Sequence, residues 1–166
     1  MRKFIKKVQI GIICFLILVA AESGSAQGRN VNWLIGYQGK ARIAFNSTSY
    51  NISPEVRKIP FIDTQGNISD ENGNLLISSN GYFIADATGD TMQNGSGINP
   101  GSCTADYGPP YGMFLPYGNL ILPMPEDTSK YVLFHQTCDY NSPFLTPTVT
   151  YYTVIDMTLN NGLGAV

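Results

Sequence analysis

The sequence predicts an all-β protein, built as a meander of short antiparallel strands. Helical periodicity is nearly absent after residue 26, and Gly, Pro, Asn, Ser and Tyr interrupt short apolar runs at close intervals. A turn-like pattern, Asp-x-x-Gly-Asn/Asp, also occurs three times, at 63–67, 70–74 and 86–90. Asp, Asn and Gly are residues that tight turns prefer, so a short strand is expected between neighbouring turns.

The first 26 residues have the order of a secretory signal peptide. An apolar run from Val8 to Ala21 is followed by small residues at 23–26 and is preceded by four basic residues, Arg2, Lys3, Lys6 and Lys7. This order predicts export, with cleavage after Ala26 or after Ala21. A membrane anchor is the alternative, but the run is shorter than the roughly 20 apolar residues that a spanning helix needs. We therefore expect residues 27–166 to form the mature chain, secreted or held at the cell surface.

The charge of the mature part argues against nucleic acid as a partner. After residue 26 the eleven acidic residues outnumber the six basic ones, and no basic cluster remains. Binding to a phosphate backbone depends on Lys and Arg that neutralise phosphates, so this class of partner is not expected.

The clearest hairpin joins LLISS at 75–79 to YFIAD at 82–86. The Asn-Gly dipeptide between them predicts a two-residue turn with positive φ at both positions. Further strands are expected at 32–37, 41–46, 119–122, 131–137 and 148–157, where β-branched and aromatic residues gather. Residues 93–118, rich in Gly, Pro and Tyr, are expected to form a long loop.

Two cysteines remain in the mature part, Cys103 and Cys138. An even number of cysteines in an exported chain favours a disulfide. The alternative is two separate buried thiols.

The acidic stretch at 70–74 has the composition of either a calcium loop or a plain turn. Oxygen ligands on flexible turns suit Ca²⁺, but this stretch lacks the alternating carboxylates and the closing acidic residue of such a loop. A turn in which Asp70 accepts backbone N–H bonds and Gly73 takes the left-handed conformation accounts for the same residues. We expect the acidic motifs to be hairpin corners and predict no metal site.

The only histidine, His135, is expected to be structural. Strand alternation places it on the same face as Tyr131 and Leu133. No Gly-x-Ser-x-Gly turn accompanies it, and a metal site would need a second histidine or paired thiolates. Gly-rich phosphate loops and Cys-x-x-Cys motifs are also absent from the sequence. We therefore expect neither a catalytic residue nor a cofactor.

Four aromatic residues are candidates for a binding surface: Trp33, Tyr107, Tyr111 and Tyr117. Rings with polar tips are common on recognition surfaces, and such a platform would suit a sugar or a peptide. The three tyrosines could equally pack the proline-rich segment against the sheet. Both interpretations are open at this point.

The order of several motifs resembles a family. The motifs are Trp33-Leu34-Ile35-Gly36 followed by Gly39 and Phe45; Ile68-Ser69-Asp70; NGNLL at 72–76 followed by Asn80-Gly81; Met92-x-Asn94-Gly95; Pro123-x-Pro125 with Tyr131-x-x-Phe134; YYTVIDM at 151–157; and NNGLG at 160–164. Together they resemble the propeller-like N-terminal region of large secreted proteins of gliding bacteria. Such proteins often end in a type IX secretion sorting domain or a gliding-motility-associated C-terminal domain.

The resemblance covers nearly all of the mature chain, with two departures. Residues 96–118, which contain Cys103, differ from the Ser/Thr/Gln-rich stretch of the family, and Gln65 stands where Glu is common. The resemblance implies a partial β-propeller of about two to three blades over residues 27–166, with a small β-sandwich as the alternative fold. Asp90-Thr91-Met92 also fits the short pattern that such bacteria O-glycosylate at the threonine, here Thr91.

These observations favour a non-catalytic function in binding, adhesion or scaffolding, as the N-terminal propeller region of a larger exported protein. The alternative is a non-catalytic or glycan-binding part of an extracellular hydrolase. The expected partners are an extracellular glycan or protein and further blades of the same chain beyond Val166. A blade takes about 40–45 residues and a ring 4–8 blades, so residues 27–166 supply an open arc. Because an open arc leaves apolar faces and sheet edges in water, we expect these residues alone to be marginally stable or to self-associate.

Overall fold

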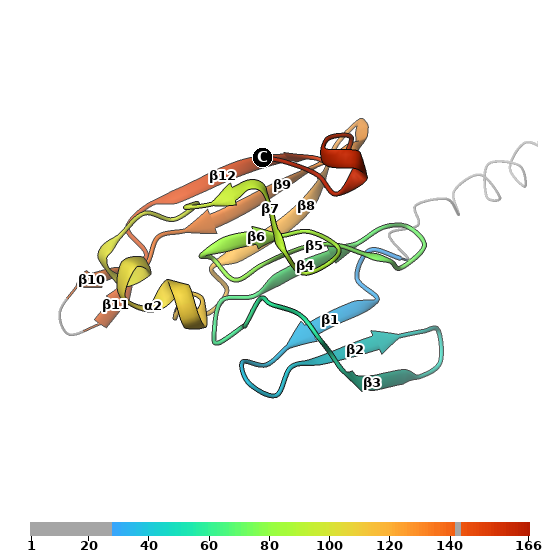
Figure 1. The fold of residues 1–166 in the computed structure, drawn as a ribbon, viewed down its shortest axis with the longest axis horizontal. Helices are drawn as coiled ribbons and strands as arrows, with labels where there is room; N and C mark the ends of the chain where they lie inside the picture. Colours follow the sequence, from blue (N-terminus) through green and yellow to red (C-terminus); the bar gives the residue numbers. More distant parts are fainter. Residues whose placement is uncertain (1–27, 142–143) are drawn as a thin grey trace, which may run out of the picture.

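The structure, a computed structural model, describes residues 28–141 and 144–166, which fold mainly into antiparallel β-sheets (Figure 1). The predicted signal peptide, residues 1–26, lies outside the described residues. The N-terminal sheet contains β1 (Asn32–Ile35), β2 (Ala41–Phe45) and β3 (Tyr50–Pro54). The middle sheet contains β4 (Gly66–Ser69), β5 (Leu75–Ser79), β6 (Phe83–Ala85) and β7 (Thr91–Ser96). The C-terminal sheet contains β8 (Asn119–Met124), β9 (Asp127–Gln136) and β12 (Thr150–Asp156).

Smaller elements complete the described chain. The hairpin of β10 (Asp139–Asn141) and β11 (Phe144–Thr146) lies beside α2 (Ser102–Tyr111) at one end of the molecule, and a short 3-10 helix, η1, covers Asn160–Gly162 (Figure 1). Within the described residues, no helix is long and apolar enough to cross a membrane. The strands of each larger sheet are arranged in chain order, β1-β2-β3, β4-β5-β6-β7 and β8-β9-β12. The all-β meander predicted from the sequence is therefore confirmed.

The middle sheet is covered on both faces. One face packs against the C-terminal sheet through a buried layer of Ile68, Ile77, Ile84 and Met92 against Ile121, Tyr131, Leu133 and Ile155. On the other face, Ala85, Leu75 and Phe83 pack against Leu34 of β1 and against Ile59 and Phe61 of the segment after β3. Each fully buried side chain of this kind contributes about 1.5–3 kcal/mol relative to its exposed state. The order of layers is therefore N-terminal, middle and C-terminal sheet.

Side-chain amides join the N-terminal sheet to the middle sheet. The Asn67 amide accepts a hydrogen bond from the Leu34 backbone N–H at 3.2 Å and donates one to the Asn32 carbonyl at 2.7 Å. In return, the Asn32 amide donates to Ser69 Oγ at 3.0 Å and to the Gly73 carbonyl at 2.7 Å. Asn67 thus gives β1 the donor and acceptor that a paired strand would supply.

The turns bear out part of the sequence prediction. Asp70 Oδ1 accepts the backbone N–H groups of Asn72 at 2.9 Å and Asn74 at 2.8 Å, and Gly73 has a φ of 85°. The corner at 86–89 is built in the same way, since Asp86 Oδ1 accepts the N–H of Thr88 and Gly89 has a φ of 83°. The motif at 63–67 differs, because Gly66 has no positive φ and opens β4.

The predicted two-residue turn at Asn80-Gly81 is wrong. Ser79 pairs with Ile84, so four residues separate the paired positions, and only Gly81 has a positive φ. The cause is the Asn80 side chain, which is fully buried and accepts the N–H groups of Tyr82 at 3.0 Å and Phe83 at 3.1 Å. An asparagine that bonds its own following backbone favours a wider turn.

The long loop predicted at 93–118 is also wrong, because this segment contains most of β7 and the whole of α2. Helix α2 has no side-chain N-cap and includes residues of low helix propensity, so tertiary contacts must hold it. The Tyr82 ring packs directly on Gly108, where a Cβ would lie 2.2 Å from a ring carbon.

Each of the seven strands predicted from the sequence overlaps an observed strand. The short strands β3, β4, β10 and β11 were not predicted.

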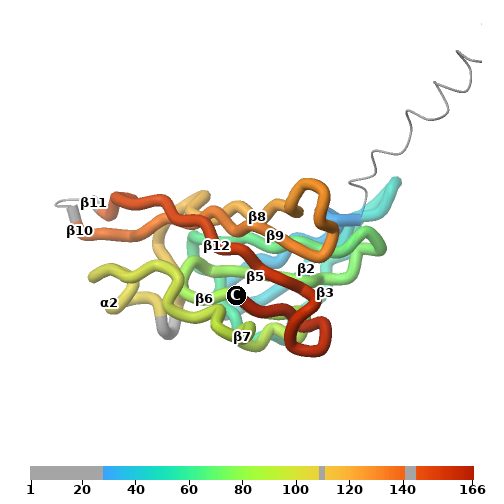
Figure 2. Tube along the Cα trace, turned by 90° about the horizontal axis from the view of Figure 1, so that it is seen from above, coloured from blue at the N-terminus to red at the C-terminus, as the bar shows by residue number. Residues whose placement is uncertain are grey.

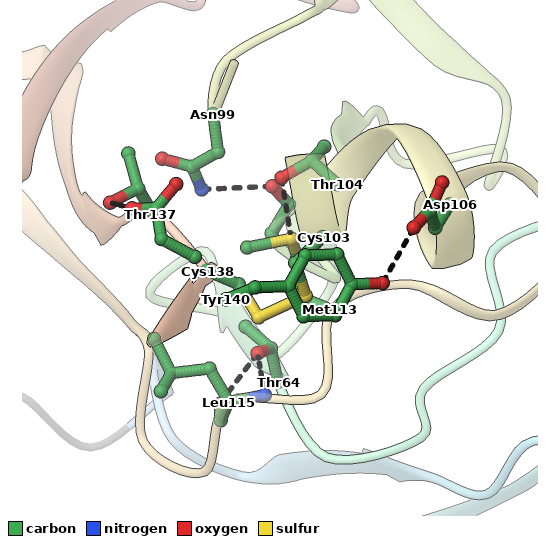
Figure 3. The surroundings of a disulfide bond; sticks show 12 residues. Thr64, Asn99, Cys103, Thr104, Asp106, Met113, Leu115, Thr137, Cys138 and Tyr140 are labelled. Carbon is green, nitrogen blue, oxygen red and sulfur yellow. Dashed lines mark hydrogen bonds between the residues drawn. A yellow bond between two sulfur atoms is a disulfide. The ribbon is translucent and has the colours of Figure 1, made fainter. Parts of the chain in front are cut away.

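A disulfide attaches α2 to the C-terminal sheet. Cys103 in the first turn of α2 bonds Cys138, which follows β9, and their Cα atoms are 5.5 Å apart (Figure 3). Figure 3 also shows the Tyr140 hydroxyl directed at Asp106 of α2, a hydrogen bond of 2.6 Å. Both contacts hold the helix against β10.

The last residues connect two sheets. Ala165 forms isolated bridges with Gln93 of β7 and Asp156 of β12, and the Val166 N–H donates to the Gln93 carbonyl at 3.0 Å. Figure 2 shows the C-terminal residues between these two strands. The edges of the middle and C-terminal sheets are therefore joined on this side by Ala165 and Val166 rather than by a strand.

Replacing Asn67 with Ala should lower the free energy of unfolding by about 1–3 kcal/mol, because Asn32 O and Leu34 N lose the partners they have within the fold. Asn51→Ala, on an exposed position of β3, is the matched control and should change stability by less than about 0.5 kcal/mol. Urea unfolding of both variants measures the difference. Equal effects of the two substitutions would contradict the role given to Asn67.

Removing the disulfide should destabilise the protein by roughly 2–4 kcal/mol, since the bridge closes a separation of 35 residues. The variant Cys103→Ala/Cys138→Ala should melt at a lower temperature than the oxidised protein and should not respond to reductant. Thermal melting with and without dithiothreitol measures both effects. A melting temperature of the unmodified protein that ignores the reductant would refute the prediction.

Candidate functional site

Tyr117 lies in a tight turn that is attached to the segment before β4. The turn spans Leu115 to Gly118 and is closed by a hydrogen bond of 3.2 Å from the Gly118 N–H to the Leu115 carbonyl. Thr64 Oγ donates to the Leu115 carbonyl at 2.6 Å and accepts the Leu115 N–H at 3.3 Å. The buried Thr64 therefore fixes the backbone of the turn from a distant part of the sequence.

The Tyr117 side chain is presented to solvent in an unfavourable backbone conformation. It is 96% exposed and has a φ of 60°. Among the described non-glycine residues with positive φ, three of five are asparagines, which tolerate this conformation, whereas a bulky tyrosine does not. Backbone strain of this kind is concentrated at functional sites, so Tyr117 is a candidate for a ligand contact.

A cleft of about 590 Å³ lies beside Tyr117. Its walls come from the segment before β4, the turn before β8 and the first two residues of β8, and are formed by Asp63, Gln65, Pro116, Tyr117, Asn119 and Leu120. A second cleft of about 160 Å³ shares Tyr117, Asn119 and Leu120 and continues toward Phe134 and Thr150. The larger volume lies in the range of about 300–1,000 Å³ that is usual for small-molecule sites.

Asn119 lines this cleft, and its amide group points into the fold. Its amide nitrogen donates to the Ser79 carbonyl at 3.0 Å, while its buried Oδ1 has no hydrogen-bond partner among the described residues. An acceptor of this kind costs about 1–3 kcal/mol unless a donor reaches it. β4 lies close to β8 at this point, since a Cβ on Gly66 would be 3.2 Å from Asn119 Cβ. With the exposed Asp63 and Gln65, the cleft offers several hydrogen-bonding groups beside one aromatic ring.

The other candidate aromatics lie elsewhere. Tyr107 and Tyr111 project from α2 and pack against Phe114, with ring centroids 4.8 and 6.2 Å apart. Tyr111 also contacts Tyr37 at 5.3 Å, and Tyr107 contacts Tyr140 at 6.5 Å. The hydrogen bond to Asp106 raises the pKa of Tyr140. Tyr107 and Tyr111 therefore pack with aromatic residues beside α2, whereas Tyr117 makes no such contact in the described part of the chain.

Trp33 lies on the outer face of the N-terminal sheet, 5.0 Å from the Phe45 ring and more than half exposed. The four aromatics named from the sequence are thus in three places, and the structure does not assemble them into one platform. Thr91 is exposed at the start of the edge strand β7, next to Asp90, which forms an ion pair with Lys58.

The acidic corner at 70–73 borders a cleft of about 320 Å³, but its polar groups are engaged within the fold. Burial raises the pKa of Asp70, and hydrogen bonds from Asn74, Asn72 and Gly73 outweigh this effect and lower it. Glu71 binds Arg29 at 2.9 Å, and Arg29 also donates to the Tyr131 hydroxyl at 2.8 Å. Within the described residues, no group of three or more potential metal ligands gathers.

His135 is buried and both of its ring nitrogens have partners. Nδ1 lies 2.7 Å from Asn99 Oδ1, and Nε2 lies 2.9 Å from Thr153 Oγ. Because the Asn99 amide nitrogen donates to the Gly81 carbonyl at 2.8 Å, the Asn99 oxygen must accept, so Nδ1 carries the proton and Nε2 accepts from Thr153. Burial lowers the pKa of His135, which is therefore neutral at pH 7.

No protein-family model, curated protein or solved structure matches this chain.

The neutral His135 should make stability fall as the pH is lowered below about 6.5. Its pKa is lowered in the folded state, so the unfolded chain takes up a proton at a higher pH than the folded chain does. Its contribution is complete above about pH 6.5, the unfolded value, and is lost as the pH falls toward the folded pKa. The lowered pKa values of Asp70, Asp139 and Asp156 act at lower pH, below about 4.

Urea unfolding between pH 5 and 8 measures this dependence. His135→Gln should be less stable than the parent at pH 8 and should have a flatter profile above pH 5, since His135 is the only histidine. An equally steep profile in the variant would assign the pH dependence to another group.

Proposed function

We propose that this chain is a non-catalytic, glycan-binding module of an exported or cell-surface protein, and that the Tyr117 cleft is its ligand site. The observation that carries the proposal is the strained, 96% exposed Tyr117 beside the cleft of about 590 Å³. The strain has a physical explanation if the ring must be held outward to meet a ligand.

The chemistry of the cleft suits a sugar ring. One face of a pyranose is rich in C–H groups and can pack on the Tyr117 ring, while hydroxyls at its rim can bond the exposed side chains of Asp63 and Gln65. A purely apolar ligand would leave these polar groups unpaired, and a polyanion would meet Asp63 without a compensating cation in the cleft wall.

The non-catalytic part of the proposal is supported by the state of His135. His135 lines the smaller cleft, but both of its ring nitrogens are bonded within the fold, so neither is free to exchange a proton with a ligand there. The carboxylates of Asp70, Asp86, Asp127 and Asp156 are likewise engaged by backbone N–H groups of their own turns.

For the finer fold we propose an arc of three blade-like sheets, as in the propeller-like regions of secreted proteins of gliding bacteria. Each sheet has its first strand innermost, since β1 contacts β4 and β4 contacts β8. The alternative, a small sandwich of the middle and C-terminal sheets, is favoured by the bridges of Ala165 to Gln93 and Asp156.

The proposal of an exported module also includes export by the signal peptide at 1–26 and O-glycosylation of the exposed Thr91.

Two substitutions at Tyr117 should separate binding from stability. Tyr117→Ala should weaken glycan binding about tenfold or more, because loss of an aromatic packing contact costs on the order of 1–2 kcal/mol. Tyr117→Gly should abolish the same contact and raise the free energy of unfolding by up to about 1 kcal/mol, since glycine accepts a φ of 60°. A glycan array followed by titration calorimetry measures binding, and urea unfolding measures stability.

Tyr50→Ala is the matched control, an exposed tyrosine on β3 that does not line the cleft. It should leave the affinity per site unchanged. Binding that survives both Tyr117 substitutions would exclude this cleft as the ligand site, and a parent protein that binds no glycan on the array would exclude the ligand class.

A further inference from the structure

The cleft beside Tyr117 continues into a further cleft on each side. Gln65 lines both the Tyr117 cleft of about 590 Å³ and another cleft of about 290 Å³, which Trp33 also lines. On the opposite side, the Tyr117 cleft shares Asn119 and Leu120 with the cleft of about 160 Å³. The three clefts therefore form one groove, with the Tyr117 cleft in its middle.

The groove crosses the first strand of each larger sheet. Its first cleft is lined by residues of β1 and the start of β4, its middle cleft by the start of β8, and its last cleft by β8, the end of β9 and the first residue of β12. β1 contacts β4, and β4 contacts β8. The walls thus belong to packed strands, so the spacing of the clefts is fixed by the fold.

Each cleft of the groove has an aromatic residue in its wall. Trp33 lines the first cleft, Tyr117 the middle one and Phe134 the last one. All three side chains are partly in water, with exposed fractions of 56% for Trp33, 96% for Tyr117 and 42% for Phe134. Aromatic rings offer an apolar surface on which the C–H face of a sugar packs. Rings at intervals along a groove suit a ligand that is itself a chain of rings.

The rest of the wall is rich in amides and poor in charge. Exposed amides are supplied by Asn30 and Gln65, and the far end of the groove carries Gln136 and Thr150. Among the described residues that line the three clefts, Asp63 is the one with a charged side chain. Amide and hydroxyl groups both donate and accept hydrogen bonds, as sugar hydroxyls do. This chemistry favours a neutral polyhydroxylated ligand over a charged polymer.

An extended peptide is the competing ligand, and the first cleft argues against its usual binding mode. A peptide strand binds by pairing with free backbone groups at a sheet edge. On the edge of β1 that faces β4, the Leu34 N–H and the Asn32 carbonyl are already bonded by the Asn67 side chain. The two groups that a peptide would need here are therefore occupied, whereas a glycan needs neither of them.

We propose that the groove binds a linear, neutral oligosaccharide whose consecutive sugars occupy the Trp33, Tyr117 and Phe134 clefts. This inference rests on the proposed function, because it starts from a sugar in the Tyr117 cleft, and it adds that the ligand is a chain rather than a single sugar. The middle cleft alone has the volume of an ordinary small-molecule site. The two outer clefts add contacts that only a longer ligand reaches, so affinity should depend on chain length.

Titration calorimetry of the protein measures this dependence. The probes are cello-, xylo-, manno-, malto-, laminari- and chito-oligosaccharides, each from the disaccharide to the hexasaccharide. In a series that binds, affinity should rise about tenfold or more between these lengths, because two further aromatic contacts form.

Trp33→Ala and Phe134→Ala test the two ends of the groove. Each should weaken binding of the hexasaccharide about fivefold to tenfold. Neither should change the affinity for the disaccharide, which the Tyr117 cleft holds, and that retained affinity also shows that the variant is folded. Tyr50→Ala is the matched control, because it removes an exposed ring of the N-terminal sheet that lines none of the three clefts. It should bind both lengths like the parent protein.

The outcomes separate this inference from the proposed function. Equal affinities for the disaccharide and the hexasaccharide would overturn the groove and leave the Tyr117 cleft as the proposed site. A gain with length that survives Trp33→Ala or Phe134→Ala would also overturn it, because the chain would then bypass one cleft. If no series binds, both fail. An oligoproline peptide is the second probe, since proline-rich chains also dock on aromatic grooves, and tighter binding of this peptide than of every oligosaccharide would assign the groove to a peptide instead.

Discussion

The sheets of this protein share almost no backbone pairing, so the peptide groups at their facing edges must be satisfied by side chains. Asn67 meets this constraint for β1, because its amide donates and accepts in the positions that a neighbouring strand would occupy. The Asn32 amide donates to the Gly73 carbonyl and to Ser69 Oγ. Buried peptide groups without such partners are costly, so these amides determine how closely the first strands can lie. The apolar layers on either side of the middle sheet then form at that spacing.

Side-chain hydrogen bonds between the sheets also position the cleft. Gly66 follows directly from the segment that Thr64 bonds to the Tyr117 turn, and its lack of a side chain allows Asn119 to approach β4. Asn119 in turn bonds the Ser79 carbonyl, the end of β5. The two hydrogen bonds of Thr64 hold the Leu115–Gly118 turn and offset the strain at Tyr117. The site is therefore a product of sheet packing and not of a flexible loop.

The sequence predicted correctly those elements whose conformation is determined by residues close to them in the chain. Strand alternation placed His135 correctly on the face of Tyr131 and Leu133, and the Asp70 turn follows from its own side chain. It missed α2, because a disulfide and the Tyr82–Gly108 contact stabilise a helix whose residues have low helix propensity. In the cleft it named Tyr117 but not its companions. Asp63 and Gln65 look like turn residues in the sequence and Asn119 like the start of a strand, and the packing of β4 on β8 brings the first two to the tyrosine.

A cleft with one aromatic ring and a few polar groups offers modest affinity for a single sugar, because few side chains contribute. Extracellular glycans repeat, however, so copies of the proposed module that are held on one surface meet neighbouring repeats at a high effective concentration. Avidity then rises without any new contact. A low affinity per site is therefore no obstacle to firm attachment, and each contact stays reversible.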